Sequence, residues 1–339
     1  MAEILKELCL LSGVSGREQD VRDYITDHIK NHVDDINIDS LGNVIAYKKG
    51  VQGKKTIMLT AHMDEVGLIL SNITDNGFIK FKAVGDIDSR NIVSKCVKIN
   101  KTVDGVLGMK AIHLQKKDER ENTVAIKDLY IDIGVKSKEK ALKRVNLGDY
   151  ISFESEYLKA GQKISVKALD ARVGCYVLLD MVKDSYEDNI YFVFTAQKQV
   201  GMRGASVAGY GLELDAALVL DAFESADMYG SKENEVTAKL GGGVCVDFMD
   251  KFAIPDKTLT DKLYNAIADA KIPVQKKRSS IGMSDAGTII RCADGVKTAC
   301  IGIPIRYMNT PQSMADMRDI KAMRDTAVLF AHGLEDIII

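Results

Sequence analysis

The stretch TIMLTAHMDE, residues 56–65, joins a nearly continuous apolar run to a cluster of ionisable side chains. An apolar run of this length is typical of a buried strand that is covered on both faces of a sheet. The run ends in His62, Asp64 and Glu65. Ligands of open α/β sheets bind at the carboxyl ends of the strands. The stretch therefore predicts an α/β fold with a polar site at the end of this strand.

Further apolar segments also end in polar side chains. VKAL (166–169) precedes Asp170, YFVFTA (191–196) precedes Gln197, Lys198 and Gln199, AALVL (216–220) precedes Asp221, and ACIGIPIRYM (299–308) precedes Asn309. We expect these residues to meet His62 at one edge of the sheet, because that edge holds the ligand sites of such folds.

The sequence pattern differs between about residue 71 and residue 165. This part contains short β-type runs separated by glycine, such as FIKFKAVG and LYIDIGV. Runs of this kind indicate a small β-rich, barrel-like unit. The flanking parts have α/β character. We therefore expect one α/β domain, residues 1–70 and 166–339, interrupted by a β insertion, residues 71–165.

Two short patterns predict where helices begin. Ser15 and Glu18 have the spacing of a capping box, in which each side chain satisfies a backbone N–H of the first helical turn. Ser313 and Asp316 have a similar spacing and precede an amphipathic run. We expect a helix to start at each of these two positions.

Composition excludes several classes of partner. The 46 lysines and arginines nearly balance 48 aspartates and glutamates, so net charge gives no reason to expect nucleic acid or an anionic membrane. The six cysteines are scattered without a CxxC pair, which favours reduced core cysteines. No apolar segment approaches the length of a membrane span. We expect a cytoplasmic protein.

His62 is the histidine placed where a metal ligand is expected, but a lone histidine is more often a core residue. Asp170, for its part, could cap a helix. The His62-x-Asp64 spacing shifts the balance toward a metal, because a ligating imidazole needs an acceptor such as a carboxylate on its second nitrogen. Asp64 is placed to orient His62 in this way.

Six segments together resemble the glutamyl, or tetrahedral, aminopeptidase family of di-zinc peptidases. They are AHMDEVG (61–67), KALDARVG (167–174), VGMRGA (200–205), ALVLDA (217–222), GMSDAGT (282–288) and IPIRYMNTP (303–311). Their order and spacing match across essentially the whole chain. The resemblance implies a three-layer exopeptidase domain with a central mixed sheet, and it implies that the β insertion is a dimerisation domain.

The resemblance also assigns the metal ligands. It places one zinc on His62, Asp170 and Asp221, all of which are present. The second zinc would share Asp170, but Gln199 stands at its glutamate position and Asn309 at its histidine position. Lys198 stands where the family has its general base. Ala171 follows Asp170, where the family usually has Asp or Asn.

These substitutions predict a chain that is catalytically impaired or inactive. A protonated lysine has no lone pair, so Lys198 cannot accept a proton from water. The amides of Gln199 and Asn309 are poor replacements for a carboxylate and an imidazole. We expect no metal or a single divalent ion (zinc, cobalt or manganese), and we expect the Lys198 ammonium within ion-pair range of Asp170.

Two enzymatic alternatives remain. A weak aminopeptidase could keep one metal on His62, Asp170 and Asp221, with a base recruited from elsewhere, for instance Glu65. A glucanase, a label sometimes attached to this family, requires a facing pair of acids, which the sequence lacks beyond the inherited ligands. The resemblance further implies peptides as ligands. It also implies a homodimer or higher oligomer, into which an active paralogue could assemble.

Overall fold

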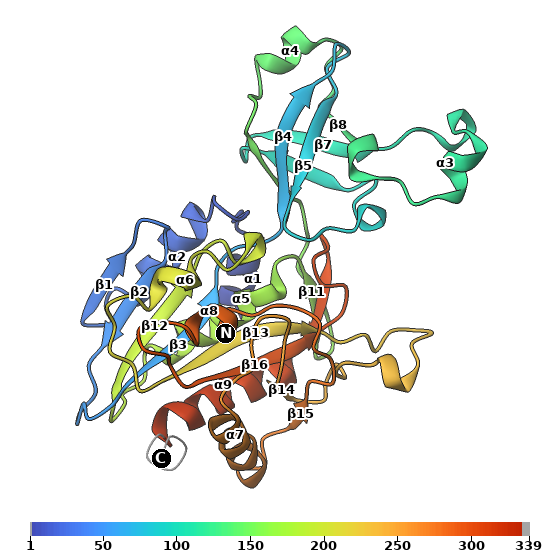
Figure 1. The fold of residues 1–339 in the computed structure, drawn as a ribbon. Coiled ribbons are helices and arrows are strands. Elements are labelled where there is room, and N and C mark those ends of the chain that lie inside the picture. The colour runs from blue at the N-terminus through green and yellow to red at the C-terminus, as the bar shows by residue number, and fades with distance from the viewer. Residues whose placement is uncertain (1, 334–339) are drawn as a thin grey trace.

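An eight-stranded mixed sheet lies at the centre of the body in the computed structural model, which describes residues 2–333 (Figure 1). In order across the sheet, its strands are β1 (Asp35–Ile38), β2 (Val44–Lys48), β12 (Asn189–Thr195), β3 (Thr56–His62), β13 (Ala216–Glu224), β16 (Thr298–Ile305), β14 (Val244–Asp247) and β15 (Val274–Lys276). β12, β3, β13 and β16 run parallel to one another. Their carboxyl ends therefore meet at one edge, as the sequence predicts.

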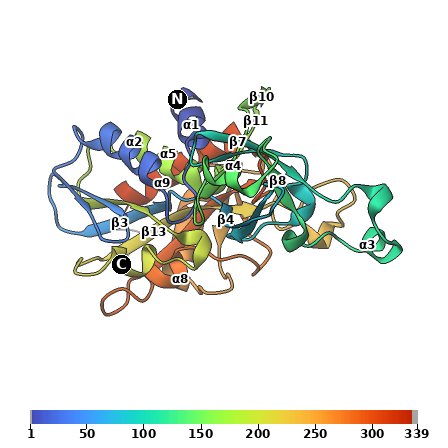
Figure 2. The same cartoon turned by 90° about the horizontal axis from the view of Figure 1, so that it is seen from above.

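Helices cover both faces of this sheet (Figure 2). One face carries α1 (Ala2–Leu10), α2 (Gln19–Ile29), α5 (Leu169–Met181), α7 (Lys257–Asp269) and α9 (Met317–His332). The other face carries α6 (Ala205–Ala208) and α8 (Ala286–Ile289). The side chains of β3 alternate accordingly, with Ile57 and Leu59 in the first core and Met58 in the second. The predicted α/β class with a central mixed sheet is confirmed.

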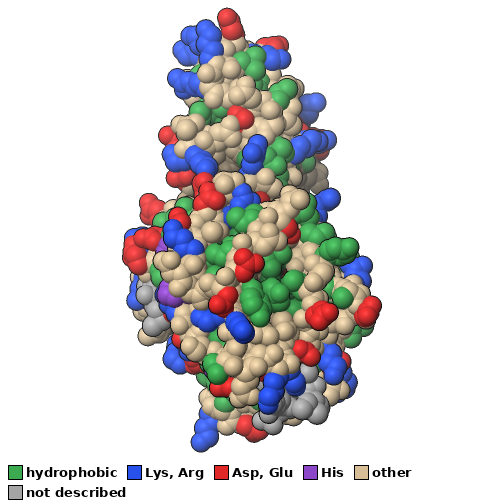
Figure 3. All heavy atoms as spheres, turned by 90° about the vertical axis from the view of Figure 1, so that its left-hand side faces the viewer, with side chains coloured by type: hydrophobic (Ala, Val, Ile, Leu, Met, Phe, Trp, Pro, Cys, Tyr) green, Lys and Arg blue, Asp and Glu red, His purple; other side chains and the backbone are tan. Residues whose placement is uncertain are grey.

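The segment between β3 and α5 contains a closed barrel that stands away from the body (Figure 1). Its strands are β4 (Gly67–Ile73), β5 (Ile79–Val84), β6 (Cys96–Ile99), β7 (Val103–Gly108), β8 (Tyr130–Asp132) and β9 (Tyr150–Phe153). The barrel has its own apolar core, which includes Leu68, Ile79 and Ile151. Figure 3 shows it as a narrower projection whose surface carries basic side chains beside acidic ones.

Short elements complete the barrel and its junction with the body. The barrel segment contains α3 (Lys117–Glu121), α4 (Lys138–Leu142) and the 3₁₀ turns η1 (Ser89–Asn91), η2 (Ile112–Leu114) and η3 (Ile126–Asp128). β10 (Leu158–Ala160) and β11 (Lys163–Val166) form a separate small sheet with β17 (Ser313–Asp316). The barrel strands thus occupy residues 67–153, while β11 pairs with β17 in the C-terminal part of the chain.

The two predictions of helix starts are wrong in detail. Glu18 precedes α2 but makes no capping bond, and Ser15 donates to Asp64 instead. Ser313 and Asp316 belong to strand β17, because that segment pairs with β11. α9 starts after it, and the Asp316 carboxylate caps it by accepting from the Arg318 backbone N–H.

Two further features are the length and polarity of the helices and the state of the cysteines. Over residues 2–333, no helix has both the length and the apolar character that a membrane crossing requires. The cysteines are free, and all but Cys96 are buried.

Candidate functional site

Three potential metal ligands meet at the carboxyl edge of the sheet. His62 is the last residue of β3, Asp221 lies in β13, and Asp170 lies at the start of α5. His62 Nε2 is 3.0 Å from Asp170 Oδ1 and 3.6 Å from Asp221 Oδ1. Within residues 2–333, this trio is the one group of at least three His, Cys, Asp or Glu side chains close enough to share a metal ion. Three protein ligands are the set that a catalytic zinc uses.

Lys198 reaches into this trio from the loop after β12, where η4 (Lys198–Val200) begins. Its Nζ lies 3.4 Å from both carboxylate oxygens of Asp170 and 3.7 Å from Asp221 Oδ1. The ammonium is buried, with 7% of the side chain exposed. The predicted ion pair between Lys198 and Asp170 is therefore confirmed.

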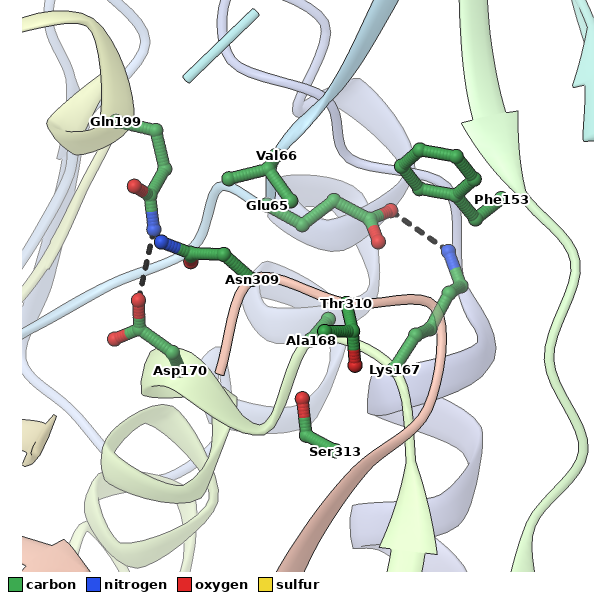
Figure 4. Close-up of a pocket in the computed structure, with 10 residues that line it drawn as sticks. All are labelled: Glu65, Val66, Phe153, Lys167, Ala168, Asp170, Gln199, Asn309, Thr310 and Ser313. Carbon is green, nitrogen blue, oxygen red and sulfur yellow. Dashed lines mark hydrogen bonds and ion pairs between the residues drawn. The ribbon is translucent and has the colours of Figure 1, made fainter. Parts of the chain in front are cut away.

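The two amide side chains lie at the same place. Gln199 Nε2 donates to Asp170 Oδ2 at 2.8 Å. Asn309 lies beside this hydrogen bond in Figure 4, and Gln199 and Asn309 line one small cavity together with Asp170. Gln199 is thus a neutral hydrogen-bonding partner of Asp170.

A pair of divalent ions does not fit these residues. The Lys198 ammonium lies against both oxygens of Asp170, the carboxylate that two ions would share. Gln199 points its N–H donor at Asp170, and its neutral amide is a poorer ligand for a hard cation than a carboxylate. Two divalent ions would bring four positive charges to two carboxylates that a lysine already neutralises in part, and uncompensated buried charge is strongly unfavourable.

Both partners of the ion pair are charged. Burial alone would raise the pKa of Asp170, but Lys198 and His62 hold that pKa well below its usual range. Burial alone would lower the pKa of Lys198, but Asp170 and Asp221 raise it above its ordinary value. The lysine is therefore a fixed cation at neutral pH, with no lone pair for accepting a proton.

Asp64 fixes both His62 and the loop that carries Lys198. The His62 Nδ1 atom lies 3.1 Å from the Asp64 backbone oxygen and 3.4 Å from its carboxylate. The same carboxylate accepts from the backbone N–H of Lys198 at 2.9 Å and of Gln199 at 2.8 Å. The sequence indicated the contact with His62, but it carried no signal for the contacts with the loop.

Glu65 belongs to a separate buried ion network (Figure 4). Its Oε1 accepts from Lys167 Nζ at 2.7 Å and from the Gly13 backbone N–H at 3.0 Å, and Arg172 lies 3.5 Å away. Arg172 also donates to backbone carbonyls of the first helix and of the segment after it. Through Arg172, this network ties the N-terminal helix to α5.

Two further acids near the site were not identified from the sequence. Glu18 accepts from the backbone N–H of Gln197 at 3.0 Å, and burial together with Asp64 raises its pKa to about 7. Asp285 accepts from the Thr195 hydroxyl, and burial raises its pKa to about 6. Both residues are distant in sequence from the groups they contact, so no local pattern could indicate these roles.

A larger cavity of about 690 Å³ opens beside the trio. Asp170, Lys198, Gln199 and Asn309 contribute to its wall. This volume lies within the range of sites for small organic ligands, roughly 300–1,000 Å³.

Comparisons with known proteins identify a family and relatives that match most of this chain. Residues 42–325 match the family described as M42 glutamyl aminopeptidase. A protein of Acetivibrio thermocellus that is provisionally named an aminopeptidase is 38% identical over 322 residues, which cover 94% of this chain and 95% of the relative.

Solved structures of aminopeptidases also match the fold. An aminopeptidase from Desulfurococcus kamchatkensis matches with a TM-score of 0.93 and 33% identity, over 97% of this chain and 94% of the other. The TET1 peptidase of Pyrococcus horikoshii, which can assemble into a tetrahedron or a large octahedral shell, matches with a TM-score of 0.86 and 29% identity, over 98% and 99% of the two chains.

Proposed function

This chain belongs to the M42 glutamyl aminopeptidase family, and we propose that it is a member that binds peptides without hydrolysing them. One observation carries the proposal: the Lys198 ammonium lies 3.4 Å from both oxygens of Asp170. By resemblance, Lys198 stands at the position of the general base and Asp170 at that of the shared metal ligand. The lysine removes the base and also places a fixed cation against that ligand.

The loss of the base is the more serious change. Hydrolysis requires a group that takes a proton from the attacking water, and a charged lysine cannot do so. Glu65 is a poor replacement, because Lys167 and the Gly13 N–H already engage its carboxylate. The arrangement of these residues thus supports binding more than turnover.

A weak one-metal aminopeptidase is the second candidate. The close trio of His62, Asp170 and Asp221 favours it, because these residues could hold one divalent ion. Such an ion would have to displace Lys198 from the same carboxylates. The candidate also needs a base. Lys167 and the Gly13 N–H engage Glu65, whereas Asp285 keeps one buried carboxylate oxygen without a hydrogen bond to the part of the chain that the structure describes, and is the acid near the site that this candidate would have to recruit.

Hydrolysis of aminoacyl p-nitroanilides should be absent, or at least roughly 10²-fold to 10⁴-fold slower than in a family member that keeps the base and all ligands. The assay should include added zinc, cobalt or manganese, so that lack of metal does not explain the result. Turnover in the ordinary enzymatic range that Asp170→Ala abolishes would overturn the proposal and favour the one-metal enzyme.

We further propose that the chain acts in the cytoplasm as a homodimer or larger assembly built through the barrel. The oligomeric TET1 peptidase with the same fold supports this, and the resemblance covers the barrel segment as well as the body. An active paralogue could enter the same assembly. Light scattering should give a mass of at least two chains at micromolar concentration, whereas a monomer would contradict this part.

A further inference from the structure

Four large apolar side chains are at least half exposed on two loops of the body, namely Met249 (51%), Phe252 (51%), Ile254 (74%) and Ile281 (81%). The first three lie in the loop between β14 and α7, and Ile281 lies in the loop between β15 and α8. The backbone N–H of Lys251 donates to the Gly282 carbonyl at 3.1 Å, so the two loops lie side by side. We refer to these four side chains as the mouth patch.

The two loops are held together by a buried carboxylate. Asp250 accepts from the backbone N–H of Phe252 at 2.7 Å and from that of Ser284 at 2.9 Å, and it thereby joins both loops. Apolar side chains that are exposed singly are ordinary, whereas a group of them on one surface marks an interaction site. The mouth patch is therefore a candidate binding surface.

The mouth patch continues the wall of the larger cavity. Ile281 belongs to both, because it lines the cavity and is also largely exposed. The wall also includes the apolar side chains of Phe223, Met283 and Met308. A ligand that is longer than the cavity can therefore leave it past Ile281 and lie on the patch.

The charges of the cavity wall favour an ammonium group over a carboxylate. The wall carries five acidic and three basic side chains, namely Asp86, Asp170, Glu224, Glu235 and Asp250 against Lys198, Lys277 and Arg278. Both buried lysines are also paired with aspartates outside this count, Lys198 with Asp221 and Lys277 with Asp247. A peptide should therefore place its N-terminal end in the cavity and its later residues at the opening.

We propose that the mouth patch binds the part of a peptide that extends out of the cavity, and that it selects apolar side chains there. The proposal rests on the proposed function, the binding of intact peptides. An extended chain advances about 3.3–3.6 Å per residue, so a few residues beyond the cavity suffice to reach the loops beside Ile281. Contact with the patch is favourable for apolar side chains, because it removes apolar surface from water.

The test compares two tetrapeptides, alanyl-alanyl-leucyl-leucine and alanyl-alanyl-seryl-serine, by isothermal titration calorimetry on the unmodified full chain. The two probes share their N-terminal half and their net charge, and they differ in the half that should lie on the patch. We expect the leucine peptide to bind roughly tenfold more tightly, the effect of partly burying apolar side chains. Equal affinity, or tighter binding of the serine peptide, would overturn the inference.

Variants locate the preference on the patch. The double variant Met249→Ser, Ile254→Ser changes two exposed residues that do not line the cavity, and it should lose most of the preference. The matched control Ile38→Ser, Val51→Ser changes two exposed apolar residues elsewhere on the body and should keep it. A Met249→Ser, Ile254→Ser protein that keeps the preference would contradict the inference. A fall in its mass by light scattering would then assign the patch to a second copy of the chain.

Chromatography of the titrated mixtures separates this inference from the proposed function. Cleavage of either tetrapeptide contradicts the proposed function and, with it, the basis of this inference. Failure of both tetrapeptides to bind contradicts both as well. Intact peptides that bind with equal affinity contradict this inference alone.

Discussion

The triple variant Lys198→Glu, Gln199→Glu, Asn309→His should bind two divalent ions and hydrolyse aminoacyl substrates that the unmodified chain leaves intact. By resemblance, these changes return the base and the two missing ligands. They also remove the ammonium that lies 3.4 Å from Asp170. His62, Asp170 and Asp221 are already close enough to share one ion. The variant therefore rebuilds the binding site of the second ion.

The gain in activity should be large, because a general base alone contributes roughly 10²-fold to 10⁴-fold to a rate. The single variant Asn309→His is the matched control. It supplies an imidazole but keeps the lysine, so it should neither bind two ions nor hydrolyse the substrate. A folded triple variant that binds no more metal than the unmodified chain would contradict the assignment of these positions.

Lys198→Ala should lower the free energy of unfolding by about 3–5 kcal/mol in the presence of a chelator. The reason is that removal of one partner leaves a buried charge uncompensated. Divalent ions should restore much of this loss, because an ion bound only to the folded state stabilises it. Urea unfolding of the variant with chelator and with excess manganese measures both effects.

Lys277→Ala is the control for this prediction. Lys277 is also a buried lysine paired with an aspartate, since its Nζ lies 2.9 Å from Asp247 Oδ2. Asp247 is not part of the His62 trio, so Lys277→Ala should be destabilised without rescue by manganese. Equal rescue of both variants, or rescue of neither, would contradict the interpretation of Lys198 as a substitute for a metal ion.

The sequence predicts the sheet and the meeting of His62, Asp170 and Asp221 at its edge well, because the signals for both are local. The apolar runs that precede His62 and Asp221 predict buried strands. Both side chains are expected at the edge of the sheet, because each follows such a run. The contact between Lys198 and Asp170 follows from charge, because a buried carboxylate without a partner is unfavourable.

The residues that hold the site in place could not be predicted in the same way. Ser15 and Glu18 have the spacing of a capping box, yet they bond to Asp64 and to the backbone of Gln197, which lie far along the chain. Ser313 likewise belongs to a strand because of β11, a partner about 150 residues earlier. Local patterns predict helix starts, but tertiary contacts decide these positions.

The most direct test of the central claim is the metal content per chain, measured by mass spectrometry of elements on protein purified without chelator. If Lys198 takes the place of the second metal ion, the unmodified chain should carry no more than one divalent ion, even after dialysis against zinc, cobalt or manganese. Two fully bound ions per chain, with the Lys198 ammonium turned away from Asp170, would contradict the claim.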